Sequence, residues 1–153
     1  METVYQPRNA LNSACAESYA LTVKPLWAWA IMHGHKRYEN RTWITRHRGP
    51  LWIHAGRFRR EDYDQAAEIL RAAKIEPPSP EELPCGVILG SVQLTQCLTV
   101  HVLGQHEPFA DGPYAWELHA PRLLPFHCPA RGLVGVWKVP ADIAALLPDF
   151  TSG

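Results

Sequence analysis

The sequence lacks the local patterns of the common nucleotide-hydrolysing and dinucleotide-binding proteins. Its 153 residues contain no Walker-type glycine loop, no GxGxxG and no GxSxG nucleophile elbow. The phosphate cradle and the strained serine turn that these motifs build are therefore not expected. No internal repeat is present either. These absences argue against a P-loop enzyme, a Rossmann-type dehydrogenase and an α/β-hydrolase.

Membrane-spanning and secretory segments are also missing from the sequence. No window of about 18 unbroken apolar residues exists, which is the length a membrane helix requires. The first residues lack a basic segment followed by a long apolar run, the pattern of a signal peptide. We therefore expect a cytoplasmic protein without membrane contacts.

The cysteines and histidines do not form a local framework for a metal. The four cysteines are scattered without a CxxC pair, so a zinc site built from them has no support in the spacing. The pairs His33-x-His35 and His127-Cys128 each offer two ligands, but no second cluster follows at metal spacing. We expect structural thiols, no bound metal and no cofactor.

Length and composition favour one compact domain made of short elements. Hydrophobic residues make up 46% of the chain and charged residues 20%, which is enough to bury a core in a single domain. Fourteen prolines and six tryptophans favour short strands joined by rigid turns, as in a small barrel. Residues 1–18 show no period and are predicted to form an N-terminal arm before a domain of residues 19–153.

The periodicity predicts both helices and strands. Pro25 suits the first turn of a helix, and Gly34 suits its end. The expected helices cover residues 25–33, 60–74 and 140–147. The expected strands cover residues 19–23, 41–43, 51–55, 86–95 with a bend near Gly90, 114–119 and 133–139, with residues 48–50 forming a turn.

The zero net charge conceals an asymmetry along the chain. Residues 33–60 hold eight Lys or Arg against one acid, Glu39, whereas residues 61–82 hold seven acids against two basic residues. A basic segment with interleaved aromatic residues is typical of surfaces that contact phosphates and stack bases. The alternative is a solvated face paired with the adjacent acidic helix.

One corner between a helix and a strand concentrates charged residues in the pattern Gly34-x-Lys36-x-x-Glu39-x-Arg41. Four further ordered motifs occupy residues 24–29, 48–55, 112–118 and 131–137. Together these motifs resemble the signature of the ASCH family, the activating-signal-cointegrator homology domains, over roughly residues 21 to 139. The resemblance implies an α+β fold, a small PUA-like β-barrel decorated by two or three helices, with a cleft lined by the signature Lys, Glu and Arg.

Two functions are consistent with this resemblance. In the first, the domain binds RNA, single-stranded nucleic acid or a modified nucleoside in a basic cleft. In the second, it is a small hydrolase without a metal, since some ASCH-like proteins deacylate acetylcytidine and others are described as ribonucleases. Those amidohydrolases place a Thr where this chain has Glu39, so the match is incomplete; Thr42 lies close by, and Glu107 or Glu117 would have to supply a carboxylate. A protein-interaction domain is a third class, without a specific feature in the sequence.

The predicted site centres on Lys36, Glu39 and Arg41, which we expect to act as one unit. Lys36 and Glu39 would be the catalytic pair in a hydrolase. Neighbouring cations lower the pKa of Lys36 whereas Glu39 raises it, and the sequence leaves the net direction open. The remaining predicted ligand-binding residues are Trp43 for stacking, His54 for hydrogen bonding, and Arg46, Arg48 and Arg57 for phosphates. The oligomeric state stays open.

Overall fold

The computed structural model describes residues 17–104, 107 and 109–149. In chain order the strands and helices are β1 (Tyr19–Val23), α2 (Pro25–Met32), β2 (Tyr38–Arg41), β3 (Gly49–Ala55), α3 (Arg60–Ala72), a 3-10 turn (Pro80–Glu82), β4 (Val87–Thr99), α4 (Val100–Leu103), β5 (Tyr114–Pro129), β6 (Val136–Lys138) and α5 (Ala141–Ala144). The predicted arm of residues 1–18 lies outside the described residues except for its last two.

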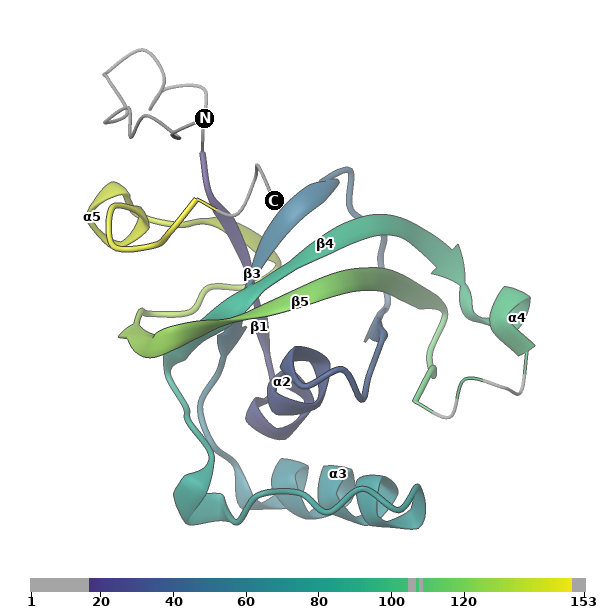
Figure 1. Ribbon diagram of the computed structural model, residues 1–153. Helices are drawn as coiled ribbons and strands as arrows, with labels where there is room; N and C mark the ends of the chain where they lie inside the picture. Colours follow the sequence, from purple (N-terminus) through teal and green to yellow (C-terminus); the bar gives the residue numbers. More distant parts are fainter. Residues whose placement is uncertain (1–16, 105–106, 108, 150–153) are drawn as a thin grey trace, which may run out of the picture.

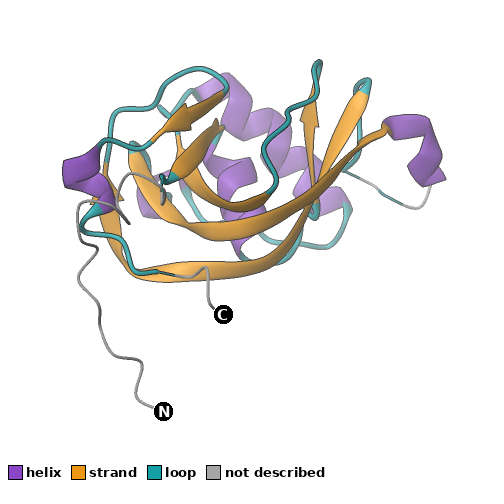
Figure 2. Cartoon of the chain, turned by 90° about the horizontal axis from the view of Figure 1, so that it is seen from above, coloured by secondary structure: helices purple, strands orange, loops and turns teal. Residues whose placement is uncertain are grey.

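One curled sheet organises the fold. Its six strands lie in the order β2-β5-β4-β3-β1-β6, with β1 and β3 parallel and the other neighbours antiparallel. The strands curve instead of lying flat (Figure 2), so the sheet forms a half-barrel. The fold is therefore α+β with a barrel-like sheet, as the sequence predicts.

A side chain helps to close the half-barrel. Strand β2 forms one edge of the sheet and β1 lies next to the other edge. The Arg41 guanidinium on β2 donates from Nη2 to the Thr22 carbonyl oxygen on β1, at 2.8 Å. This hydrogen bond spans the open side of the curled sheet, between strands that are not neighbours in it.

Helix α2 is apolar around its whole circumference because it is covered on two sides. It lies between the sheet and α3 (Figure 1). Ile31 and Met32 pack against the sheet, whereas Leu26 and Ala30 pack against α3. The helix is buried in this way by tertiary contacts on both sides, which explains a sequence with no polar face.

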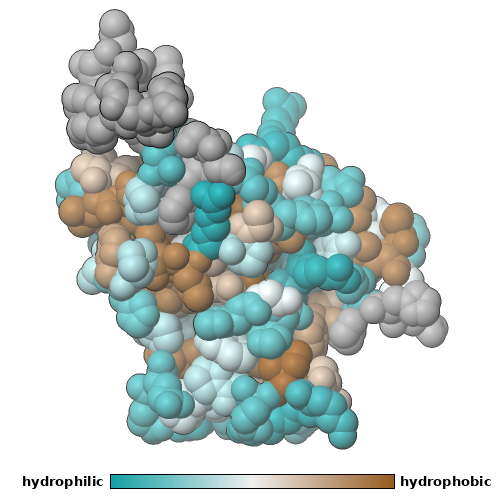
Figure 3. Space-filling model, viewed as in Figure 1, coloured by the Kyte–Doolittle hydropathy of each residue, from teal (hydrophilic) through white to brown (hydrophobic). Residues whose placement is uncertain are grey.

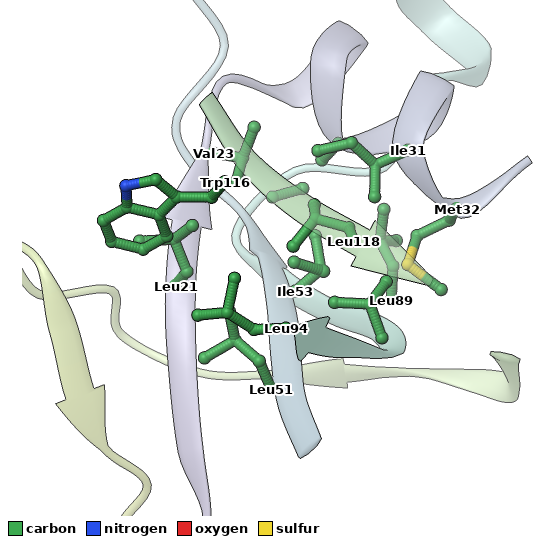
Figure 4. Close-up of a cluster of buried hydrophobic side chains, with 13 residues drawn as sticks. Leu21, Val23, Ile31, Met32, Leu51, Ile53, Leu89, Leu94, Trp116 and Leu118 are labelled. Carbon is green, nitrogen blue, oxygen red and sulfur yellow. The ribbon is translucent and has the colours of Figure 1, made fainter. Parts of the chain in front are cut away.

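The main core fills the concave side of the sheet. Side chains from β1, α2, β3, β4 and β5 meet there (Figure 4). Trp116 on β5 is fully buried in it, and Trp137 on β6 belongs to a second cluster on the other face of β1 and β3. Both tryptophans therefore occupy the interior, as the sequence predicts.

Most predicted elements are confirmed, with shifts of a few residues at their ends. Helix α2 ends at Met32 and α3 ends at Ala72. The bend predicted near Gly90 corresponds to register shifts on both sides of β4. None of the helices in the described part of the chain has the length and apolar character needed to span a bilayer.

The prediction for the segment between the signature and β3 is wrong in detail. The strand is Tyr38–Arg41, not residues 41–43, because its pairing with β5 ends at Arg41 opposite Tyr114 and leaves Thr42 without a strand to pair with. Residues 49 and 50 belong to β3, not to a turn. Strand β1 first pairs with β3 at Trp52, so the missing N–H of Pro50 costs no hydrogen bond on that side.

Strand β5 is much longer than predicted. It continues beyond residue 119 to Pro129, although Pro121 and Pro125 favour an earlier end. Beyond Glu117 this strand no longer pairs with β2, so it is an edge strand there, where proline is tolerated. Ala120, with φ 51°, marks an irregularity in the backbone.

The face of the molecule that Figure 3 shows is mixed in polarity. On this face, hydrophobic residues occupy several separate areas with hydrophilic residues between them (Figure 3). Among the large hydrophobic residues that the structure describes, Val134, in the loop before β6, is the most exposed, at 98%.

The close approach of β4 to β5 predicts that Gly90→Ala destabilises the protein. A Cβ at this position would collide with the Arg122 carbonyl oxygen and would lie 2.6 Å from the Met32 side chain. Because the obstacle includes backbone, we expect a loss of about 1 to 3 kcal/mol in the free energy of unfolding, measured by denaturant titration. Gly56→Ala is the control, since the nearest atom to its Cβ would be the Thr22 methyl group at 3.0 Å, and it should cost less. Equal stability of Gly90→Ala and wild type would contradict this packing.

Candidate functional site

The end of α2 turns the chain so that Lys36 points inward. Gly34 has φ 81°, the left-handed conformation that glycine adopts at little cost. The backbone N–H groups of His35 and Lys36 both donate to the Ala30 carbonyl oxygen, at 2.8 and 3.1 Å. These bonds fold the segment back on the last turn of the helix. The local residues of the signature thus build the corner that carries Lys36.

Lys36 is almost completely buried, with 3% of its surface exposed. Its Nζ donates to the Phe109 carbonyl oxygen at 3.0 Å and lies 4.9 Å from the centre of the Trp27 ring. Desolvation lowers the pKa of Lys36, and the charges of Glu39 and Asp111 oppose this decrease. The direction left open by the sequence is thereby settled by burial.

Asn40, like Lys36, forms a hydrogen bond with Phe109. It is not among the site residues predicted from the sequence. Its Nδ2 donates to the Phe109 carbonyl oxygen at 2.8 Å, and its Oδ1 accepts from the Asp111 backbone N–H at 2.8 Å. The Phe109 carbonyl oxygen therefore accepts from two side chains. The one available signal was the even spacing that places Lys36 and Asn40 on one side of an extended segment.

Glu39 and Arg41 form a separate pair on the opposite side of β2. Arg41 Nε donates to Glu39 Oε2 at 2.9 Å, and the guanidinium lies 6.0 Å from the centre of the Trp116 ring. Glu39 is 7% exposed. The predicted unit of three residues is thus divided: Arg41 neutralises Glu39 directly, whereas Glu39 acts on Lys36 through its charge.

Trp43 lies just beyond β2 and is partly exposed, at 38%. Its ring packs perpendicular to that of Trp116, with centroids 4.8 Å apart, and its carbonyl oxygen accepts from Trp116 Nε1 at 3.0 Å. The ring also borders Gly135. Trp43 is therefore positioned by Trp116 while part of its side chain stays exposed to solvent.

The predicted phosphate-binding arginines are divided between the two ends of β3. Arg46 and Arg48 are exposed on the loop of residues 42–48, before β3, and Arg57 is exposed just after it. Arg48 Nη1 donates to the carbonyl oxygens of Thr45 and His47, which holds the loop together. Strand β3 is seven residues long and a strand advances about 3.3 Å per residue, so roughly 20 Å of strand lies between Arg48 and Arg57. The continuous basic segment of the sequence therefore contributes to two surfaces.

His54 is a buried core residue, 2% exposed, on the face of β3 that packs against Trp137. Its Nε2 lies 2.7 Å from the Ala130 carbonyl oxygen, which can only accept, so Nε2 carries the proton. Trp137 Nε1 donates to Thr22 Oγ1, and the Thr22 hydroxyl in turn faces Nδ1 at 3.2 Å. Both ring nitrogens of His54 are therefore engaged within the protein, and desolvation lowers its pKa.

The carboxylates that a hydrolase would require are engaged by other side chains. Glu107 binds Arg37 at 2.6 Å. Glu117 accepts from Thr95 Oγ1 at 2.7 Å and from Gln96, and these hydrogen bonds contribute to lowering its pKa. Thr42 is exposed. Among the described residues, no group of three His, Cys, Asp or Glu side chains is placed to hold a metal ion.

Comparison with known proteins identifies the family. The model of the ASCH domain matches residues 21–125. This span includes the signature corner and the connection between α4 and β5 that carries Phe109, called the Phe109 loop below. The chain belongs to the ASCH domain family. Human Activating signal cointegrator 1 is 30% identical over 135 residues, and the mouse protein of the same name is 29% identical. Both matches cover 82% of this chain but 23% of the relative, so the chain spans less than a quarter of their length.

Solved ASCH structures share the fold. A single-residue mutant of ZmASCH from Zymomonas mobilis superposes with a TM-score of 0.55 at 14% identity, covering 84% of this chain and 92% of that one. The ASCH crystal structure from the same organism gives 0.50 at 15% identity, with 84% and 91% covered. At this identity the likeness extends to the fold.

The buried neutral His54 predicts a loss of stability in mild acid. Its native pKa is lowered from about 6.5, so below pH 6.5 the unfolded chain binds more protons than the native protein. The free energy of unfolding therefore decreases as the pH is lowered. The slope for one histidine is at most about 1.4 kcal/mol per pH unit. Denaturant titrations between about pH 5 and 7 measure it, a window above the ordinary carboxylate range.

His54→Gln should flatten this dependence. The pKa of His33 is also lowered, by desolvation and by His35, so His33 contributes to the pH dependence in the same direction. Because its side chain is exposed, His33→Gln should remove a smaller part of the pH dependence of the free energy of unfolding than His54→Gln. If the slope of the free energy of unfolding against pH is unchanged in His54→Gln, His54 is not the cause of the stability loss in acid.

Proposed function

We propose that this ASCH domain binds single-stranded RNA through the loop of residues 42–48 and the adjacent signature corner. The observation that carries the proposal is the combination on one loop of a partly exposed Trp43, packed against Trp116, with the exposed Arg46 and Arg48. Aromatic rings stack unpaired bases while cations follow the backbone, the usual arrangement for single-stranded nucleic acid. The general association of the ASCH family with RNA binding supports the same conclusion.

The location of the cations also matters for the proposal. The chain has no net charge, so no long-range field of the whole molecule attracts a polyanion. Attraction must come from local charge. Arg46, on the loop with Trp43, has no ion-pair partner among the described residues, whereas Arg37 at the corner is paired with Glu107. Arg57 and Arg59 are exposed as well, but the loop of residues 42–48 combines its exposed arginines with the exposed ring of Trp43.

Salt dependence of RNA binding tests this proposal. Affinity for single-stranded RNA should fall as salt rises, because each neutralised phosphate releases counterions. The double variant Arg46→Ala, Arg48→Ala should reduce the slope of log affinity against log salt by about 0.7 for each phosphate that is no longer neutralised. Fluorescence anisotropy titrations over a salt series measure both quantities.

A matched pair of arginines at the other end of β3 provides the control. Arg57→Ala, Arg59→Ala removes the same charge after the strand instead of before it, so it should leave more of the slope intact. If this pair has the larger effect, the binding surface includes Arg57 and lies toward α3. Absence of RNA binding at low salt would reject the proposal.

A hydrolase acting on an acylated nucleoside is a second candidate, favoured by one observation. Lys36 and Asn40 both donate to one carbonyl oxygen, an arrangement that would polarise the carbonyl of a substrate. Incubation of acetylcytidine and of single-stranded RNA with the wild type and with Lys36→Ala, followed by chromatography, tests it. The binding proposal predicts intact substrates in both samples. Product formed by the wild type alone would establish the hydrolase instead.

A further inference from the structure

The Phe109 loop presents a distinctive pair of groups to the signature corner. Its carbonyl oxygen accepts from Lys36 Nζ at 3.0 Å and from Asn40 Nδ2 at 2.8 Å. Two residues on, the Asp111 N–H donates to Asn40 Oδ1 at 2.8 Å. The side-chain amide of Asn40 therefore pairs with a carbonyl oxygen and an N–H at the same time.

The use of a lysine at this point is costly for a purely structural contact. Desolvation disfavours the charged amine, as the lowered pKa of Lys36 shows. Glu39, the nearest acid in sequence, is hydrogen bonded to Arg41. The hydrogen bond of Lys36 goes to a neutral backbone carbonyl, and the Trp27 ring and the charges of Glu39 and Asp111 offset only part of the cost of burying the amine. A strong donor kept in this place suits a carbonyl group of a ligand better than it suits the chain itself.

The loop also covers an aromatic surface. The Phe109 ring lies 5.6 Å from the Trp27 ring, with a tilt of 54° between the two planes. Trp27 in turn lies under Lys36 Nζ. A ligand that replaced Phe109 would therefore find an aromatic ring beside the two polar side chains, which is the environment that a planar base requires.

We infer that Lys36 and Asn40 form a site for a nucleobase with a lactam edge, a carbonyl oxygen next to a ring N–H, which takes the place of the Phe109 carbonyl and the Asp111 N–H. Uracil, guanine and hypoxanthine carry this edge. The inference rests on the proposed binding of single-stranded RNA and names the bases that the corner selects.

The chemistry of the site distinguishes these bases from adenine and cytosine. A carbonyl oxygen has two lone pairs and can accept from Lys36 and Asn40 together, whereas a ring nitrogen has one. Adenine offers only ring nitrogens as acceptors on its Watson–Crick edge. Cytosine has a carbonyl oxygen, but the ring nitrogen beside it is an acceptor and cannot donate to Asn40 Oδ1. Both bases therefore leave part of the site unpaired, which is the penalty that produces specificity.

Equilibrium binding of matched homopolymers tests the inference. Short oligomers of uridine, 3-methyluridine, cytidine and adenosine are titrated against the full chain at one salt concentration. We expect oligouridine to bind about tenfold more tightly than the other three, since a good bidentate contact discriminates by about this factor. The 3-methyl group is the sharpest comparison because it removes the N–H and keeps both carbonyl groups.

Variants test whether the preference for oligouridine arises at the signature corner. Asn40→Ala should bring the affinity for oligouridine down to that for oligocytidine. Gln96→Ala is the control: it removes a side-chain amide on β4 that donates to Glu117 on β5, and it should keep the preference for oligouridine over oligocytidine. If Asn40→Ala does not fold, Phe109→Ala replaces it: weaker packing on Trp27 should make the loop easier to displace and raise the affinity for oligouridine several-fold, with oligocytidine unchanged.

The outcomes separate the two proposals. Binding of all four oligomers with equal affinity would overturn the lactam site while leaving RNA binding in place. A uridine preference that persists in Asn40→Ala, or an unchanged oligouridine affinity in Phe109→Ala, would also overturn it. Failure of every oligomer to bind would reject both proposals together.

Discussion

The antiparallel register of β2 and β5 sets Glu39 opposite Trp116 and Asn40 opposite Ala115. Successive side chains of a strand point to opposite faces, so this register sends Glu39 toward the interior of the half-barrel and Asn40 toward the loop before β5. A shift of one residue would exchange the two sets of side chains. The chemistry of the corner therefore depends on a backbone pairing as much as on the signature residues.

The corner holds its buried charges in two different ways. Glu39 is neutralised by a direct ion pair with Arg41, and the same guanidinium links β2 to β1 through the Thr22 carbonyl oxygen. Lys36 instead donates to the neutral carbonyl of Phe109, and desolvation lowers its pKa. A buried pair without net charge is the less costly arrangement. Lys36 is thus the position where the fold retains an expensive group, a common property of functional sites.

The basic segment of the sequence does not act as one surface. Strand β3 lies between Arg48 and Arg57 and carries them to opposite ends of the sheet. At one end, Arg48 donates to backbone carbonyl groups of a loop that also carries Trp43, whose ring packs against Trp116. The placement of the cations beside an exposed ring, more than their number, is what supports the proposed nucleic-acid site at this end.

The sequence by itself determined what depends on near neighbours. Pro25 and Gly34 marked the ends of α2 because a first-turn proline and a left-handed glycine are local requirements, and the motifs identified the family and its α+β sheet. Only the tertiary structure decided the full length of β5, the burial of His54 and the contact of Asn40 with the Phe109 loop. Asn40 meets partners 69 and 71 residues further along the chain. The spacing of Asn40 indicates which side of the segment it occupies, but the sequence does not show which distant loop the pairing of β2 with β5 brings to that side.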